Sequence, residues 1–153
     1  MKLLDTITTQ RICLLKHHSK ERILDELIDC AVRSGLDCDS ADLKERILYR
    51  ERLMSTGIGL GIGMPHVRLE GVKEPIVTIG LQPDGIVGYE SIDNLPVKLV
   101  FLILAGKEQH KQYLELLAHI VKIVKRSGVI DALLSAPDSE AVYRVLQEEA
   151  HHV

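Results

Sequence analysis

The stretch STGIGLGIGMPH, residues 55–66, stands apart from the rest of this 153-residue chain because glycine alternates with apolar residues from Gly57 to Gly63. A period of two predicts an extended backbone, in which one face of the stretch carries no side chains. Another backbone or a ligand can approach such a face closely. Since ordering glycine costs conformational entropy, we expect the bare face to have a purpose in the folded protein.

Two helices are predicted before this stretch. Apolar residues recur with helical spacing over residues 20–35, where Ser19 is a suitable N-cap and Gly35 a suitable stop. A second helix is expected from residue 39 or 40 to about residue 52. The apolar residues expected to face inward from it are Leu43, Ile47 and Leu48.

Two strands are predicted after the glycine-rich stretch, at Ile76–Leu81 and Val97–Leu104. Both are rich in β-branched or large apolar residues, and each follows a proline. The second has no polar alternation after its start and is expected to be buried on both faces. The connection Gln82–Leu95 contains turn signals, Pro-Asp-Gly and Asp-Asn, and a candidate short strand at Ile86–Tyr89.

Helices are predicted to complete the chain. A long one over about residues 107–126 stops before Gly128, and two short ones follow at Ile130–Leu134 and Ser139–Glu149. The apolar stripe expected on the long helix is Leu114, Leu117, Val121 and Val124. No repeat or linker interrupts the pattern, so residues 1–153 are interpreted as one domain in which helices and strands interleave in α/β layers.

Charge and composition exclude several classes of protein. The chain has 19 Lys+Arg against 22 Asp+Glu, a net charge of −3, and no long run of one sign, so nucleic acid is not an expected partner. The longest apolar run, Leu99–Ala105, is too short to cross a membrane, and residues 1–5 do not open a signal peptide. Cys13, Cys30 and Cys38 form no CxxC pair. These features favour a cytoplasmic protein with free, structural thiols and without membrane insertion.

His66 is the strongest candidate for chemistry. It ends the glycine-rich stretch directly after Pro65, whose ring restricts the backbone and helps to hold the imidazole in one direction. A neutral imidazole is a nucleophile at cytosolic pH. The alternative is a loop histidine without a function, which is the more common case for a lone histidine.

No metal or cofactor site is predicted. His110 and His119 are nine residues apart and lie half a turn out of phase on a helix, and the pairs at residues 17–18 and 151–152 lie near the chain ends. The sequence has no GxGxxG or GxxxxGK[ST] pattern for a nucleotide, and no GxSxG pattern for a serine hydrolase.

Residues 50–66, RERLMSTGIGLGIGMPH, resemble the active-site signature of the EIIA domains of the fructose/mannitol type in the phosphotransferase system, which has an RE pair, then STGIG, then GIA-apolar-PH. Ser91–Phe101 is similar to the later strand entry of the family, particularly in its nitrogen-regulatory branch. Tyr113–Leu117 resembles the HLxLL helix, and Ser19–Glu21 resembles the start of a family helix. The resemblance spans nearly the whole chain.

This resemblance implies a fold and an activity. The fold is a single-domain α/β sandwich with a mixed sheet of about five strands and helices on both faces. The activity is that of a phosphocarrier, in which His66 takes a phosphoryl group from the phosphohistidine of an HPr-like protein. An EIIB domain or a regulatory target protein then receives the group or responds to it, and the nitrogen-regulatory type is favoured over sugar transport. No cofactor is implied.

Roles for individual residues follow from the resemblance. Arg50 occupies the position of the arginine beside the phosphorylated histidine, where a planar guanidinium can hold two phosphate oxygens. Ser55 and Thr56 offer hydroxyl and amide donors nearby, although the same hydroxyls also suit a turn or a cap.

Three residues depart from the family pattern. Gly63 replaces an alanine, and Val67 replaces a small residue and can crowd a docking partner. Tyr113 stands where the family has a second histidine, and a tyrosine can donate a hydrogen bond but carries no positive charge. His110, three residues earlier on the same helix face, is a candidate substitute. The alternative function is therefore an EIIA-like binding module that is not phosphorylated and docks a protein partner.

Overall fold

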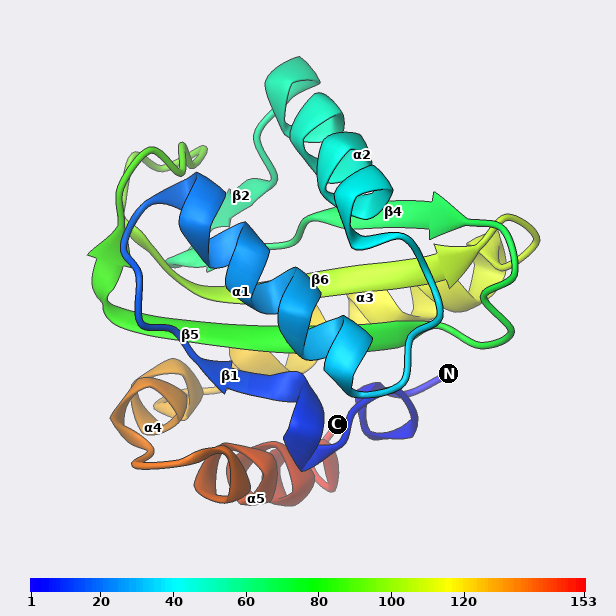
Figure 1. Ribbon diagram of the computed structural model, residues 1–153. Coiled ribbons are helices and arrows are strands. Elements are labelled where there is room, and N and C mark those ends of the chain that lie inside the picture. The colour runs from blue at the N-terminus through cyan, green and yellow to red at the C-terminus, as the bar shows by residue number, and fades with distance from the viewer.

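The computed structural model describes residues 1–153 and shows a mixed sheet with helices on both faces (Figure 1). Its strands are β1 (Ile12–Leu14), β2 (Gly57–Gly59), β3 (Ile62–Gly63), β4 (His66–Leu69), β5 (Ile76–Ile86) and β6 (Val97–Gly106). Its helices are α1 (Lys20–Arg33), α2 (Ser40–Leu53), α3 (His110–Val124), α4 (Val129–Ser135) and α5 (Ser139–Ala150). Two 3-10 turns, Leu3–Asp5 and Thr9–Arg11, precede β1. The predicted sandwich is confirmed, with six strands where about five were expected.

The sheet is built around the antiparallel pair β5 and β6, and β1 adds to β5 in parallel. The other edge of β6 is covered by two short strands in succession. β3 pairs in parallel with its first half, where Ile62 lies opposite Leu99, and β4 pairs in parallel with its second half, where His66 lies opposite Ile103. The chain therefore places His66 on the short strand β4, directly beside the central strand β6.

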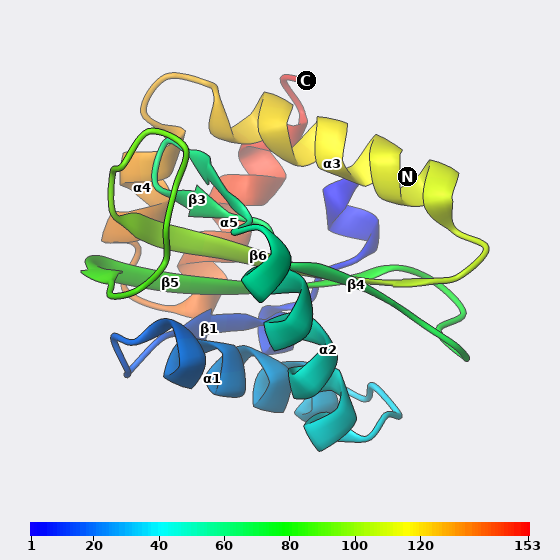
Figure 2. The same ribbon diagram turned by 90° about the horizontal axis from the view of Figure 1, so that it is seen from above.

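Strand β6 separates two hydrophobic cores, which explains why its sequence is a continuous apolar run. Leu99, Phe101 and Ile103 belong to a core shared with α3, α4 and α5. Val100, Leu102 and Leu104 belong to a core shared with α1 and α2. Figure 2 shows α3 on one side of the sheet and α1 and α2 on the other. The prediction that this strand is buried on both faces is confirmed.

Helices α1 and α2 begin at the positions that the sequence predicts. The Ser19 side chain accepts a hydrogen bond from the Arg22 amide, and Gly35, at a φ of 111°, follows the last turn of α1. Asp39 caps α2 by accepting from the amides of Ala41 and Asp42. None of the five helices combines the length and the apolar character that crossing a membrane requires.

The apolar stripe predicted for α3 is partly wrong. Leu114 is 50% exposed, whereas Leu116, Ile120 and Ile123 are fully buried. Apolar residues occupy two adjacent stripes of this helix, so periodicity alone did not say which one faces the sheet. Helix α3 also begins three residues later than expected, at His110.

The sequence predicts that the glycine-rich stretch is one extended segment, but in the structure it forms a hairpin. β2 and β3 run antiparallel, and the chain reverses at Leu60 and Gly61, which have φ values of 60° and 78°. The expectation of a close approach is confirmed. A Cβ on Gly57 would lie 2.1 Å from the Glu90 carbonyl oxygen, and a Cβ on Gly63 would lie 2.6 Å from the Tyr89 ring.

Strand β5 is longer than predicted, because it continues through the Pro-Asp-Gly sequence to Ile86. The pairing with β6 is irregular between Leu81 and Ile86. The short strand expected at Ile86–Tyr89 is not formed, since Val87 makes only an isolated bridge with Ser19. Tyr89 instead lies buried in a loop. The short strands β1 and β4 were not predicted, because three or four residues show too little alternation.

Candidate functional site

The backbone around His66 is fixed on the sheet. The carbonyl oxygen of Pro65 accepts a hydrogen bond of 2.9 Å from the Ile103 amide, and His66 itself begins β4. Its side chain is half-buried. Pairing with β6 therefore holds the backbone next to the imidazole, a constraint that comes from the sheet in addition to the one expected from the Pro65 ring.

The hydrogen bond of the His66 ring defines which of its nitrogens can react. Nδ1 lies 3.2 Å from the Met64 carbonyl oxygen, which can only accept, so Nδ1 carries the proton and Nε2 keeps its lone pair. Burial lowers the pKa of His66, and the charges of Arg50 and Arg68 lower it further, against the raising effect of the Met64 carbonyl and Glu51. The imidazole is therefore neutral at pH 7, and Nε2 is its nucleophilic nitrogen.

The His66 side chain lines a cavity of about 380 Å³, hereafter the His66 cavity. Three elements contribute to it: the last turns of α2, the start of β4 and the first turn of α3. Its seven lining residues are Arg46, Tyr49, Arg50, His66, Val67, Arg68 and Tyr113. Three of them are arginines and none is a carboxylate, which makes the cavity suitable for an anion.

Arg50 lies in this cavity, and Arg46 shares its helix face four residues earlier. The two differ in their partners. The Arg46 guanidinium is paired with Asp42 at 3.0 Å, whereas the Arg50 guanidinium forms no hydrogen bond or ion pair within the protein. Arg50 is therefore free to donate to a bound anion.

Tyr113 packs against the catalytic candidate. The ring centroids of His66 and Tyr113 are 5.0 Å apart, with the planes inclined by 35°. Burial raises the pKa of Tyr113, although the charges of Arg50 and Arg68 oppose the shift. The phenol therefore stays neutral near pH 7 and adds no charge to the site.

His110 does not line the His66 cavity. It is the exposed first residue of α3, its ring centroid lies 6.4 Å from that of Tyr113, and its Nδ1 accepts a hydrogen bond from the Arg68 guanidinium. The structure thus brings His110 to Tyr113, as the helical spacing predicted, and adds a contact with Arg68 that the sequence did not suggest.

Ser55 and Thr56 are absent from the cavity lining, and both hydroxyls already have partners. The Ser55 hydroxyl donates to the Glu90 carbonyl at 2.6 Å. The Thr56 hydroxyl lies 2.5 Å from a carboxylate oxygen of Glu51 and 2.6 Å from the Tyr89 hydroxyl. These bonds join the start of the β2–β3 hairpin to Glu51 and to the distant Tyr89–Glu90 segment, and the only local turn contact is the 3.4 Å hydrogen bond that the Ser55 hydroxyl accepts from the Gly57 amide.

Glu51 links the end of α2 to the start of the β2–β3 hairpin. It is buried, accepts from the Thr56 amide at 3.0 Å and lies 3.6 Å from the Lys20 ammonium. Lys20 also lies 4.2 Å above the ring centroid of Tyr89. The glutamate of the RE pair therefore anchors the entry to the β2–β3 hairpin, and Tyr89 occupies the space that glycine leaves at Gly63.

Val67 lines the cavity and also packs against the core that the sheet shares with α1 and α2. Its side chain is half-buried, so only part of it is open to solvent. The sequence did not predict that three further residues line the cavity, Arg46, Tyr49 and Arg68. A signal was present for both arginines, because Arg46 precedes Arg50 by one helical turn and Arg68 shares a strand face with His66.

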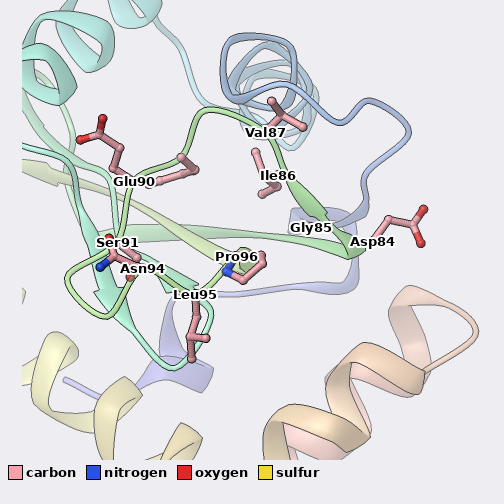
Figure 3. A pocket seen from close by; sticks show the side chains of 10 residues that line it. Asp84, Gly85, Ile86, Val87, Glu90, Ser91, Asn94, Leu95 and Pro96 are labelled. Atoms are coloured by element: carbon pink, nitrogen blue, oxygen red, sulfur yellow. The ribbon is translucent and has the colours of Figure 1, made fainter.

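A second cavity of about 560 Å³ lies at the end of β5 and in the loop that follows (Figure 3). It shares no lining residue with the His66 cavity. Its ionisable side chains include the carboxylates of Asp84 and Glu90, which point away from each other in Figure 3. This cavity contains no histidine, cysteine, lysine or arginine and offers no nucleophile of the kind found at His66.

Three of the five remaining histidines take part in separate side-chain contacts. His17 pairs with Glu26, His18 pairs with Asp84, and the Nδ1 of His119 accepts from the Leu3 amide. No group of three or more His, Cys, Asp or Glu side chains is arranged to hold a metal ion.

Comparison with known proteins gives consistent matches. The family model described as "Phosphoenolpyruvate-dependent sugar phosphotransferase system, EIIA 2" matches residues 6–149. A nitrogen regulatory protein of Pseudomonas aeruginosa is 37% identical over 128 residues, which cover 84% of this chain and 82% of that protein. The fructose-specific EIIABC component of Bacillus subtilis is 34% identical over 149 residues, 97% of this chain and 23% of that longer protein.

A solved structure agrees with both. The crystal structure of the nitrogen regulatory protein IIA-Ntr from Neisseria meningitidis has a TM-score of 0.83 and 26% identity, over 93% of this chain and 97% of that one. The matched region of the family model contains every residue that lines the His66 cavity. The resemblance read from residues 50–66 is therefore confirmed, and the chain belongs to the EIIA 2 family of the phosphoenolpyruvate-dependent sugar phosphotransferase system, with nitrogen regulatory proteins among its relatives.

Proposed function

We propose that this protein is a phosphocarrier that accepts a phosphoryl group on Nε2 of His66 from the phosphohistidine of an HPr-like protein. One observation carries the proposal: a neutral imidazole, with Nδ1 bound to the Met64 carbonyl, lines a cavity that contains three guanidinium groups and no carboxylate. A nucleophilic nitrogen beside an anion-binding cavity is the arrangement that phosphoryl transfer requires.

The transfer step exchanges one N–P bond for another. The lone pair of Nε2 forms the new bond to phosphorus, and the electron pair of the breaking bond returns to the nitrogen of the donor. The donor ring, which has lost the phosphoryl group, becomes neutral. The proton on Nδ1 of His66 stays in place, so the His66 ring becomes positively charged when its Nε2 is phosphorylated. The Met64 carbonyl, 3.2 Å from Nδ1, stabilises that charge through its hydrogen bond.

Arg50 is proposed as the clamp on the phosphoryl oxygens. The transition state of phosphoryl transfer is loose and spreads negative charge over the three equatorial oxygens, so the protein contributes mainly positioning and donors. Arg50 lines the cavity with an unpaired guanidinium, and a planar fork can donate to two oxygens at once.

The destination of the phosphoryl group is proposed from the relatives. A nitrogen regulatory protein is 37% identical to this chain, and an IIA-Ntr structure has a TM-score of 0.83, which favours a regulatory target protein. The fructose-specific relative, at 34% identity, is named for joined A, B and C components, which supports an EIIB domain as the other acceptor. We favour the regulatory branch, in which the phosphorylated form acts as the signal.

Val67 and Tyr113 favour a second candidate function. Tyr113, whose ring centroid lies 5.0 Å from that of His66, is uncharged, and Val67 occupies part of the cavity wall. A module that docks a partner without phosphorylation requires neither a cation at position 113 nor open access to Nε2. In that case the partner would bind the protein and its His66→Ala variant equally well.

Intact-mass measurement after incubation with a phosphorylated HPr-type donor tests the proposal. We expect one acid-labile phosphoryl adduct that maps to His66, no adduct on the His66→Ala variant, and an unchanged adduct on a His152→Ala control, which alters an exposed histidine near the C-terminus. An adduct that persists on the His66→Ala variant would refute the assigned site. A mass that stays unchanged with several competent donors would instead favour the binding module.

A further inference from the structure

Strand β4 and helix α3 face each other through two pairs of side chains. Residues two apart on a strand share a face, so His66 and Arg68 point to the same side of β4. His110 and Tyr113 lie about one turn apart at the start of α3. His66 packs against Tyr113, and Arg68 donates a hydrogen bond to His110. The nucleophile and an arginine are therefore held side by side by the same two elements.

The bond between Arg68 and His110 preserves the positive charge of the arginine. A guanidinium can only donate, so the accepting Nδ1 of His110 is unprotonated in this bond, and the imidazole is a neutral partner. An arginine paired with a carboxylate, as Arg46 is with Asp42, has its charge compensated. Arg68 is oriented by its partner without being neutralised.

The charges in the His66 cavity match a bound phosphoryl group. Arg46 is compensated by Asp42, which leaves Arg50 and Arg68 as the two guanidinium groups without an acidic partner. A phosphoryl group carries about two negative charges near neutral pH. Arg50 comes from α2 and Arg68 from β4, so the two cations reach the cavity from different elements.

We propose that Arg68 is a second phosphoryl clamp, which acts together with Arg50 on the oxygens of the group bound to His66, and that His110 is the positioning residue for Arg68. This inference rests on the proposed phosphocarrier function. The clamp acts on the step already written, in which Nε2 of His66 gains the N–P bond and the donor nitrogen keeps the released electron pair. Arg68 contributes hydrogen bonds to phosphoryl oxygens and exchanges no proton.

Two phosphoryl donors distinguish a clamp role of Arg68 from a role in docking the donor protein. Arg68 is exposed and therefore accessible to a donor protein as well, so labelling is measured both with a phosphorylated HPr-type protein and with phosphoramidate. In the small donor a P–N bond breaks, the phosphoryl group passes to Nε2, and the nitrogen leaves as ammonia. Loss of a charged clamp slows both reactions, whereas loss of a docking contact slows only the first.

The variants are chosen to test both residues. Arg68→Gln is expected to slow labelling about tenfold with either donor, less than the loss of an enclosed oxyanion donor because the side chain is exposed, and Arg68→Lys is expected to recover part of the rate. His110→Ala is expected to slow labelling by roughly threefold, and His110→Gln to restore it, because the amide oxygen can still accept from Arg68. Arg144→Gln, at an exposed arginine of α5, is the matched control.

The outcomes distinguish the clamp from the underlying function. If the parent protein is labelled and Arg68→Gln matches its rate with phosphoramidate, the clamp is refuted while the phosphocarrier function stands. If only the reaction with the protein donor slows, Arg68 is a docking residue and the clamp is again refuted. If no donor labels the parent protein, both proposals fail together. If His110→Gln is as slow as His110→Ala, the positioning role of His110 is wrong.

Discussion

The imidazole of His66 and the phenol of Tyr113 lie 5.0 Å apart between ring centroids, inclined by 35°. This contact joins the first residue of β4 to the first turn of α3 and closes one side of the His66 cavity. It also removes water from the imidazole, and burial is the largest cause of the lowered pKa of His66. The aromatic contact therefore covers one side of the imidazole, and burial of this ring favours its neutral form.

Truncation of Tyr113 should raise the pKa of His66 toward the ordinary histidine value. In Tyr113→Ala the imidazole gains water, so its charged form costs less free energy. The pKa is measured by NMR titration of the ring, and Tyr143→Ala on α5 serves as a control. An unchanged pKa in Tyr113→Ala would show that another neighbour supplies the burial.

The pH profile of labelling should be shifted to the acid side. Because the folded pKa of His66 is lowered, the neutral nucleophile persists as the pH falls into a range where an exposed histidine is protonated. The single-turnover rate with phosphoramidate should therefore lose half its value below about pH 6.5, the ordinary histidine pKa. Arg50→Gln should move this midpoint upward, since it removes a positive charge that disfavours the imidazolium. A midpoint above that of a model imidazole would contradict the assignment.

Loss of the Arg50 guanidinium should slow labelling strongly. Arg50→Ala removes an unpaired, charge-assisted donor from the cavity, and an effect of about 10²–10³-fold is expected by analogy with lost oxyanion donors. The rate is measured by intact mass under single-turnover conditions, with Arg144→Ala as a control. Transfer at the parent rate would mean that Arg50 does not clamp the phosphoryl group.

A methyl group at position 63 should destabilise the fold through Tyr89. A Cβ there would lie 2.6 Å from the Tyr89 ring, so Gly63→Ala is expected to lower the free energy of unfolding by about 1–3 kcal/mol. Tyr89→Leu vacates the ring, and Gly63→Ala should cost less in that background. Urea unfolding of the four proteins measures the coupling, and strictly additive effects would exclude the ring as the cause.

Glu51 should contribute to stability through its acceptor oxygens. Glu51→Ala leaves the buried Thr56 amide without its partner, and we expect a loss of about 1–3 kcal/mol in the free energy of unfolding. Glu51→Gln keeps one acceptor oxygen and should lose less. Thermal and urea unfolding compare the two variants, and equal losses would indicate that charge, and not hydrogen bonding, is the important property.

Local sequence signals were sufficient for part of the fold. Ser19 caps α1 as predicted, and α2 begins within the predicted start at residue 39 or 40, because a capping side chain satisfies amides of its own first turn. The run in β6 was recognisable because a strand buried between two cores has no polar face. The motif over residues 50–66 led to the family and to His66, since a contiguous signature needs no tertiary contact to be read.

Other features depended on contacts between distant segments. The reversal at Leu60 and the buried face of α3 were decided by the sheet against which they pack, because the local pattern suited more than one arrangement. The sequence by itself determined the helix starts, the central strand, the family and the candidate nucleophile. Only the tertiary structure decided that Arg68, held by His110, joins Arg50 in the cavity, because these side chains come from three separate elements and electrostatic contact acts through space.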